Sequence, residues 1–117
     1  MAELLISKFD TSKLSEAHGG TILAHSGLPE HPQLKFGSAW GCLKPGMVQA
    51  KLAEPNISKI YVAIQGAVRI VADGKNYELH AGEACFFPAG IEHTVMQIGA
   101  KDYAGFAMWW EVKDDEK

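Results

Sequence analysis

Three side chains in the middle and second half of the chain have types that could do chemistry if the fold brings them together: Glu54, Lys59 and His93. A histidine and a carboxylate can move a proton to or from a substrate, contact a polar ligand, or bind a metal ion weakly. A protonated lysine can do none of the metal chemistry, because an ammonium group has no lone pair and repels a divalent cation. We therefore take His93 and Glu54 as the candidate catalytic pair, with a weak divalent metal at the same two residues as the other possibility.

Each of these residues also has a plainer interpretation. His93 can be a core histidine that is held by one hydrogen bond. Glu54 would be costly to bury without a partner, and Lys59 is the available partner for an ion pair. The alternative is that Pro55-Asn56 interrupts the strand and leaves both charges at a solvated mouth.

Alternation along the strands indicates which residues accompany the charged ones. Tyr61 has the same parity as Lys59, and Gln97 has the same parity as His93, so each pair points to one face of its strand. The predicted ligand-binding residues are Glu54, Lys59, Tyr61, His93 and Gln97. An ammonium group among apolar walls favours a small ligand that carries a carboxylate or phenolate. If Glu54 already pairs with Lys59, a neutral polar ligand is favoured instead.

Composition narrows the class of protein. The chain has 117 residues, of which 47% are hydrophobic and 21% charged, as in one ordinary globular domain. The net charge of -3 gives no basic excess, so we expect no nucleic-acid partner. No apolar run reaches the ~18 residues of a membrane span and no cleavable leader is visible, so we expect a cytoplasmic protein without a membrane partner.

The elements that must position these side chains are strands. Residues 1–33 show little periodicity and are predicted to be an N-terminal arm that packs on a domain at 34–112, while 113–117 form a polar tail. From Leu34 onward, short runs rich in β-branched and aromatic residues alternate with Gly and Pro, which is typical of an all-β domain. Strands are expected at 34–43, 47–54, 59–65, 84–87, 93–98 and 103–112.

Two local patterns are more specific. Asp73-Gly74 predicts a two-residue hairpin that places Ile70 opposite Tyr77 and Arg69 opposite Glu78. Adjacent Trp109 and Trp110 must face opposite ways on a strand, so one of them is expected at the pocket or at a subunit interface.

The segment from Gly82 to His93 resembles the second motif of the cupins, a family of compact jelly-roll β-barrels. Gly82, Pro88, Gly90 and His93 stand at the spacings of that motif, and Gln97 takes the place of its usual Asn. The resemblance implies an all-β fold, a jelly-roll barrel of two antiparallel sheets with the N-terminal arm outside it. It also implies that His93 enters a strand pointing into the barrel.

The first cupin motif is present in its glycines, but its metal-ligand positions hold other residues. Gly46 and Gly66 match its ends, but Leu52, Glu54 and Lys59 stand where the family carries His, His and Glu. In metal cupins those residues and the second-motif histidine bind a transition metal. The resemblance therefore implies a degenerate metal site with no metal ligand set and no tightly bound cofactor.

Three functions from different classes remain open after the resemblance. The favoured one is a small-molecule-binding cupin of unassigned pathway. The second is an isomerase, epimerase or lyase-type enzyme that uses His93 and Glu54 as acid and base. The third is a metal-dependent, dioxygenase-like cupin that completes its site with an arm histidine: His18, His25 or His31. Small cupins are commonly paired, so a homodimer is also expected.

Overall fold

The computed structural model describes residues 6–17, 21–28 and 36–112. One 3₁₀ turn and ten strands account for nearly all regular structure within these ranges. They are η1 (Thr11–Lys13), β1 (Ser15–Ala17), β2 (Thr21–His25), β3 (Gly37–Leu43), β4 (Val48–Leu52), β5 (Ile57–Gln65), β6 (Ala67–Ala72), β7 (Lys75–His80), β8 (Ala84–Phe87), β9 (His93–Gln97) and β10 (Tyr103–Glu111). Within the described ranges, no helix is long and apolar enough to cross a membrane.

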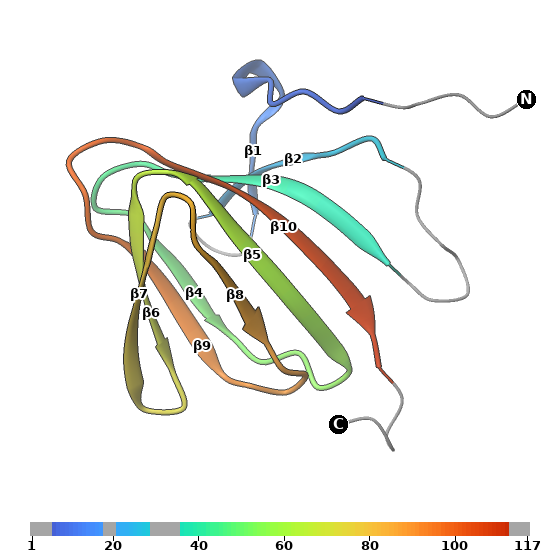
Figure 1. Ribbon diagram of the computed structural model, residues 1–117, viewed down its shortest axis with the longest axis vertical. Coiled ribbons are helices and arrows are strands. Elements are labelled where there is room, and N and C mark those ends of the chain that lie inside the picture. Colours follow the sequence, from blue (N-terminus) through green and yellow to red (C-terminus); the bar gives the residue numbers. More distant parts are fainter. Residues whose placement is uncertain (1–5, 18–20, 29–35, 113–117) are drawn as a thin grey trace, which may run out of the picture.

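The strands form two sheets whose neighbours are all antiparallel (Figure 1). One sheet has six strands in the order β1-β2-β3-β10-β5-β8, and the other has four in the order β4-β9-β6-β7. The predicted all-β architecture of two antiparallel sheets is confirmed.

The hairpin at Asp73-Gly74 is confirmed in its register. Asp73 and Gly74 have φ values of 50° and 75°, the left-handed conformation that a tight hairpin turn requires. Ile70 pairs with Tyr77 and Arg69 pairs with Glu78, as predicted. Because the register fixes which side chains face inward, the buried residues of β6 alternate strictly with more exposed ones.

Some strand boundaries differ from those predicted. Part of segment 1–33 forms β1 and β2, and β2 extends the six-stranded sheet by pairing with β3. The strand expected over 34–43 begins regular pairing at Gly37. Residues 34 and 35 and the predicted tail at 113–117 lie outside the described residues. The strand expected over 47–54 ends at Leu52, so Glu54 belongs to the loop before β5 and not to a strand. The turn at Pro55-Asn56 explains this correction, because proline has no amide hydrogen to continue the ladder.

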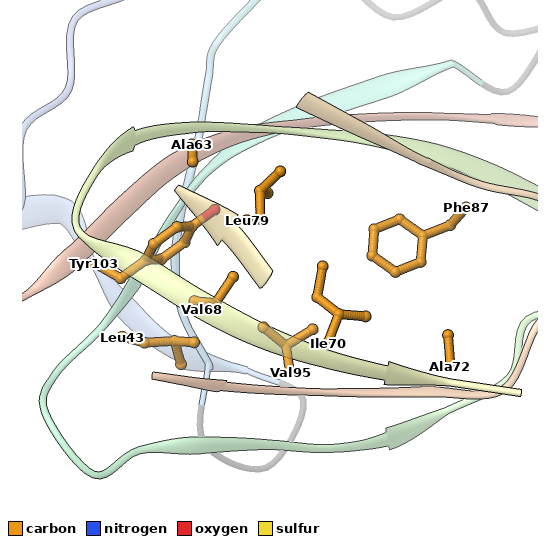
Figure 2. Close-up of a cluster of buried hydrophobic side chains, with 9 residues drawn as sticks. All are labelled: Leu43, Ala63, Val68, Ile70, Ala72, Leu79, Phe87, Val95 and Tyr103. Carbon is orange, nitrogen blue, oxygen red and sulfur yellow. The ribbon is translucent and has the colours of Figure 1, made fainter. Parts of the chain in front are cut away.

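The core lies between the two sheets and is mainly aliphatic (Figure 2). Its buried members are Leu43, Ala63, Val68, Ile70, Ala72, Leu79, Phe87, Val95 and Tyr103. Both sheets contribute, so neither sheet buries its apolar face without the other.

Gly105 on β10 is required by close packing. A Cβ atom built there would lie 2.7 Å from the carbonyl oxygen of Val62 and would also overlap the Tyr103 hydroxyl. We predict that Gly105→Ala lowers the free energy of unfolding by roughly 1–3 kcal/mol in urea titrations, because backbone must shift to admit the methyl group. Gly41→Ala is the matched control, since Gly41 is the cross-strand partner of Gly105 and its new methyl group would find the nearest atom, in Leu23, at 3.7 Å. Equal stability of the two variants would contradict this packing.

Candidate functional site

The structure brings Glu54, Lys59 and His93 together. The Lys59 Nζ atom lies 2.5 Å from Glu54 Oε1 and 3.5 Å from His93 Nε2. The Lys59 side chain is 8% exposed, whereas that of Glu54 is 38% exposed. The ammonium is therefore buried between two acceptors, and the carboxylate is the member that reaches solvent.

Separate elements supply the three side chains. Lys59 lies on β5, between Phe87 on β8 and Trp109 on β10. His93 is the first residue of β9, where it pairs with β4 on one side and β6 on the other. The loop that carries Glu54 is fixed by backbone bonds, because the Glu54 carbonyl accepts from the Gly90 amide at 2.9 Å and from the Ile57 amide at 3.2 Å. Gly90 belongs to the motif turn before His93, so the same turn supports two members of the cluster.

The outcome for Glu54 and Lys59 combines the two interpretations that the sequence left open. Pro55-Asn56 does interrupt the strand, yet the two charges still form an ion pair. Only the carboxylate side of that pair is at a solvated position.

A backbone hydrogen bond sets the tautomer of His93. Its Nδ1 atom lies 3.0 Å from the Ile91 carbonyl oxygen, which can only accept, so Nδ1 carries the hydrogen. The Nε2 lone pair then faces the Lys59 ammonium. Burial lowers the pKa of His93 most strongly, Lys59 lowers it further, and the Ile91 bond partly opposes both. His93 is therefore a neutral acceptor at neutral pH.

Aromatic rings form the wall around this cluster. The Phe87 ring lies 4.5 Å from the His93 ring and 4.6 Å from the Tyr61 ring, measured between centroids. The Lys59 ammonium lies 5.9 Å from the centroid of Tyr61, within the range of a cation–π contact. Burial raises the pKa of Tyr61 to about 12, against a lowering by its hydrogen bond with Gln49. Tyr61 is thus uncharged, and its hydroxyl group is hydrogen-bonded to Gln49.

The structure also decides which of the two adjacent tryptophans faces the site. Trp109 is the cross-strand neighbour of Lys59 and of Gly37, and a Cβ on Gly37 would lie 2.7 Å from the indole ring. Trp110 faces the other way and stacks on Phe86, at 6.2 Å between ring centroids. Trp109 is a site residue that strand parity alone could not select, because parity says only that the two rings diverge.

Gln97 has a different environment from the one predicted. Its side-chain amide donates to the Lys101 carbonyl, and its Oε1 accepts from the Gly99 amide. Both ends of the amide group therefore hold the 98–101 turn. The contacts give Gln97 a role in that turn, and its predicted ligand contact stays a prediction.

Tyr61 lines a small cavity inside the barrel. Gln49, Val95 and Tyr103 also line this cavity, whose volume is about 50 Å³. That volume admits water molecules, whereas organic ligands commonly occupy ~300 Å³ or more. This cavity is therefore too small for an organic ligand, and Glu54 is the solvent-exposed member of the charged cluster.

The residues at this site do not fit the divalent metal ion that metal cupins bind, nor the weak divalent metal considered at His93 and Glu54. One imidazole and one carboxylate converge there, but both already accept from the Lys59 ammonium, whose positive charge opposes a second cation. Among the described residues, no group of three or more His, Cys, Asp and Glu side chains is arranged to hold a metal ion. Of the arm histidines, His25 is exposed at the end of β2, while His18 and His31 lie outside the described residues. A metal site completed by an arm histidine stays a prediction.

Comparison with known proteins agrees with the motifs. The model of the cupin domain family matches residues 39–108. Among solved structures, plu4264 protein from Photorhabdus luminescens superposes with a TM-score of 0.77 at 19% identity, covering 97% of this chain and 91% of that one. A cupin 2 conserved barrel domain protein from Salinispora arenicola gives 0.74 at 23% identity, covering 93% and 90%. KdgF from Halomonas sp. gives 0.76 at 16% identity, covering 97% and 100%.

These likenesses concern the fold. All three identities are below 25%, so the reactions and ligands of those proteins do not transfer to this chain. A comparison with proteins of curated function finds no match.

The environment of His93 predicts how stability depends on pH. Because the folded protein lowers the pKa of His93 from its ordinary 6.5, the unfolded chain binds the proton more readily. The free energy of unfolding should therefore fall as the pH drops below about 6.5, and His93→Gln should remove this part of the fall in urea titrations. His80→Gln is the control, because the side chain of His80 is 57% exposed. An unchanged pH profile in His93→Gln would refute the assigned environment.

The alignment of the first motif predicts what would restore metal binding. The triple change Leu52→His, Glu54→His, Lys59→Glu removes the ammonium and supplies the His, His and Glu that metal cupins carry at these positions. Calorimetric titration with Ni²⁺ should give about one equivalent bound by the folded triple variant. A folded triple variant that binds no metal would show that the motif has been aligned wrongly.

Proposed function

Because this chain belongs to the cupin domain family, we propose that it binds a small molecule at a degenerate metal site in which the Lys59 ammonium takes the place of the metal ion. The observation that carries the proposal is the position of Lys59 Nζ, 2.5 Å from Glu54 Oε1 and 3.5 Å from His93 Nε2. A fixed internal cation retains part of what a metal offers, a positive centre that orients a polar ligand.

Energetics support a role in binding over a role in stability. Placing an ammonium at 8% exposure costs desolvation, and the attraction of a partner often does no more than offset that cost. An apolar side chain of similar volume would fill the same space without this cost. A cluster that is costly to bury and exposed to solvent on one side supports a role in ligand recognition.

The charge of the cluster selects the kind of ligand. Glu54 and Lys59 together are close to neutral, and His93 is uncharged, so the anionic carboxylate or phenolate loses its advantage over a neutral polar molecule. An ammonium has three N–H donors, of which the described residues account for two through Glu54 and His93. The favoured ligand is a small neutral molecule whose carbonyl or hydroxyl oxygen accepts the third.

The same geometry disfavours the acid/base enzyme. A general base must present a free lone pair to its substrate, whereas the Nε2 lone pair of His93 faces Lys59. The Glu54 carboxylate is accessible but is engaged in the ion pair. An isomerase or lyase would need Lys59 to move away first, so binding is the function that the arrangement supports best.

Binding of a matched set of single-ring probes tests the proposal. Benzamide is neutral, benzoate is its anionic counterpart and benzylammonium its cationic one, and calorimetry or amide NMR shifts at β5 and β9 would measure each affinity. We expect benzamide to bind most tightly. Lys59→Met should lower the affinity for benzamide at least tenfold, because a hydrogen bond to a buried charged group is lost. Such a loss is worth about 1.5–3 kcal/mol.

Lys75→Met is the matched control, since Lys75 is an exposed lysine at the start of β7. It should bind benzamide like the parent protein. Tighter binding of benzoate than of benzamide would show that Glu54 does not neutralise the site. Equal benzamide affinity in the Lys59 variant and the parent would remove Lys59 from the proposal.

A further inference from the structure

A second cavity, of about 460 Å³, lies at the side of the sandwich. β7 is the terminal strand of the four-stranded sheet and β8 is the terminal strand of the six-stranded sheet, and residues of both line this cavity. The turn at 81–83 joins these strands at one end, where the Gly82 amide donates to the Ala63 carbonyl at 2.9 Å. The cavity therefore lies between two sheet edges that the 81–83 turn connects at one end.

The walls of this side cavity are apolar. Ile70, Ala72, Leu79 and Phe87 are core residues that also line it, and Ile91 packs beside them. Figure 2 shows the Phe87 ring reaching from β8 toward the strand that carries Ile70 and Ala72. The volume lies within the ~300–1,000 Å³ that small-molecule pockets commonly have.

Tyr77 gives a second, independent sign that this space is open. Its cross-strand partner is Ile70, so it has the inward parity of β7, yet it is 51% exposed. Leu79 has the same parity two residues later and is 5% exposed. The sandwich thus closes over Leu79 and leaves the Tyr77 ring uncovered beside the cavity.

The carboxylates that line the rim are already engaged. Glu78 lies 3.8 Å from Arg69 and 3.1 Å from His80 Nε2, on the two sides of its carboxylate. Glu83 accepts from the His80 amide at 2.7 Å. Because these two acids have partners at the surface, the cavity presents apolar walls and aromatic rings to an occupant.

We propose that this side cavity binds an uncharged molecule built on one or two aromatic rings. The Phe87 and Tyr77 rings offer stacking or edge contacts, and the aliphatic side chains of β6 and β7 take the remaining surface. A charged ligand would lose its hydration without a counter-charge in return. The site is separate from the Lys59 cluster and does not rest on the proposed function, although Phe87 contacts both, through His93 on one side.

Indole is a suitable probe, because it is uncharged, bicyclic and soluble. We expect added indole to shift the amide NMR signals of β6, β7 and β8, and these shifts should saturate as the indole concentration rises. Ala72→Phe places a ring in the cavity and should lower the affinity for indole at least tenfold. Val71→Phe adds the same ring to the other face of β6 and should leave the affinity within twofold. Equal affinity of both variants for indole would overturn the proposal.

A chemical measurement covers the case in which Ala72→Phe does not fold. Cys85 lines the cavity and is half-buried, whereas Cys42 is buried elsewhere in the core. Saturating indole should slow the reaction of Cys85 with 4,4′-dithiodipyridine at least fivefold in the parent protein, followed peptide by peptide by mass spectrometry. An unchanged Cys85 rate at saturation would contradict the site.

Two further binding measurements distinguish this side cavity from the Lys59 cluster of the proposed function. Indole-3-acetate, the anionic analogue, should bind more weakly than indole; binding as tight as that of indole would contradict an apolar, uncharged site. Lys59→Met should bind indole like the parent protein, and a loss of indole binding there would place indole at the Lys59 cluster instead.

Discussion

The ammonium of Lys59 is the constraint on which the rest of the site depends. A charge at 8% exposure must be paired, and its two acceptors come from the loop before β5 and from the first residue of β9. The turn at Gly90 supports both acceptors. Its amide donates a hydrogen bond to the Glu54 carbonyl, and the chain continues from this turn into His93. The buried cation and this backbone hydrogen bond together connect the loop before β5, the 88–90 turn and the start of β9.

Burial sets the protonation states of the neighbouring groups, and the Lys59 cation adds to its effect at His93. His93 is neutral because burial and the adjacent ammonium both oppose its protonation, and the Ile91 carbonyl leaves Nε2 as the acceptor. Tyr61 is uncharged because burial raises its pKa to about 12. The result is a cluster of low net charge with one positive centre, beside the Phe87 and Tyr61 rings, with Trp109 as the cross-strand neighbour of Lys59. We propose that this cluster orients a neutral polar molecule and does not transfer protons.

Much of the fold was predictable, because it depends on local rules. The Asp73-Gly74 turn fixed the register of β6 and β7, and motif spacing placed His93 at the start of an inward-facing strand. The sequence could not place Glu54, since whether Pro55 ends a strand or kinks it depends on the 88–90 turn beside it. Parity could not choose between Trp109 and Trp110, and the side cavity depends on how far two sheet edges stand apart, a tertiary property without a local signal.

We propose that the Lys59 ammonium occupies the position of a cupin metal ion and donates a hydrogen bond to His93 Nε2. Long-range ¹H–¹⁵N NMR of the His93 imidazole at neutral pH measures this directly, because it reports which ring nitrogen carries the hydrogen and whether the other accepts one. A neutral ring protonated at Nδ1, with an Nε2 signal that moves when Lys59 is changed to Met, is the predicted result. A ring protonated at Nε2, or a doubly protonated ring, would contradict the donation from Lys59 to His93.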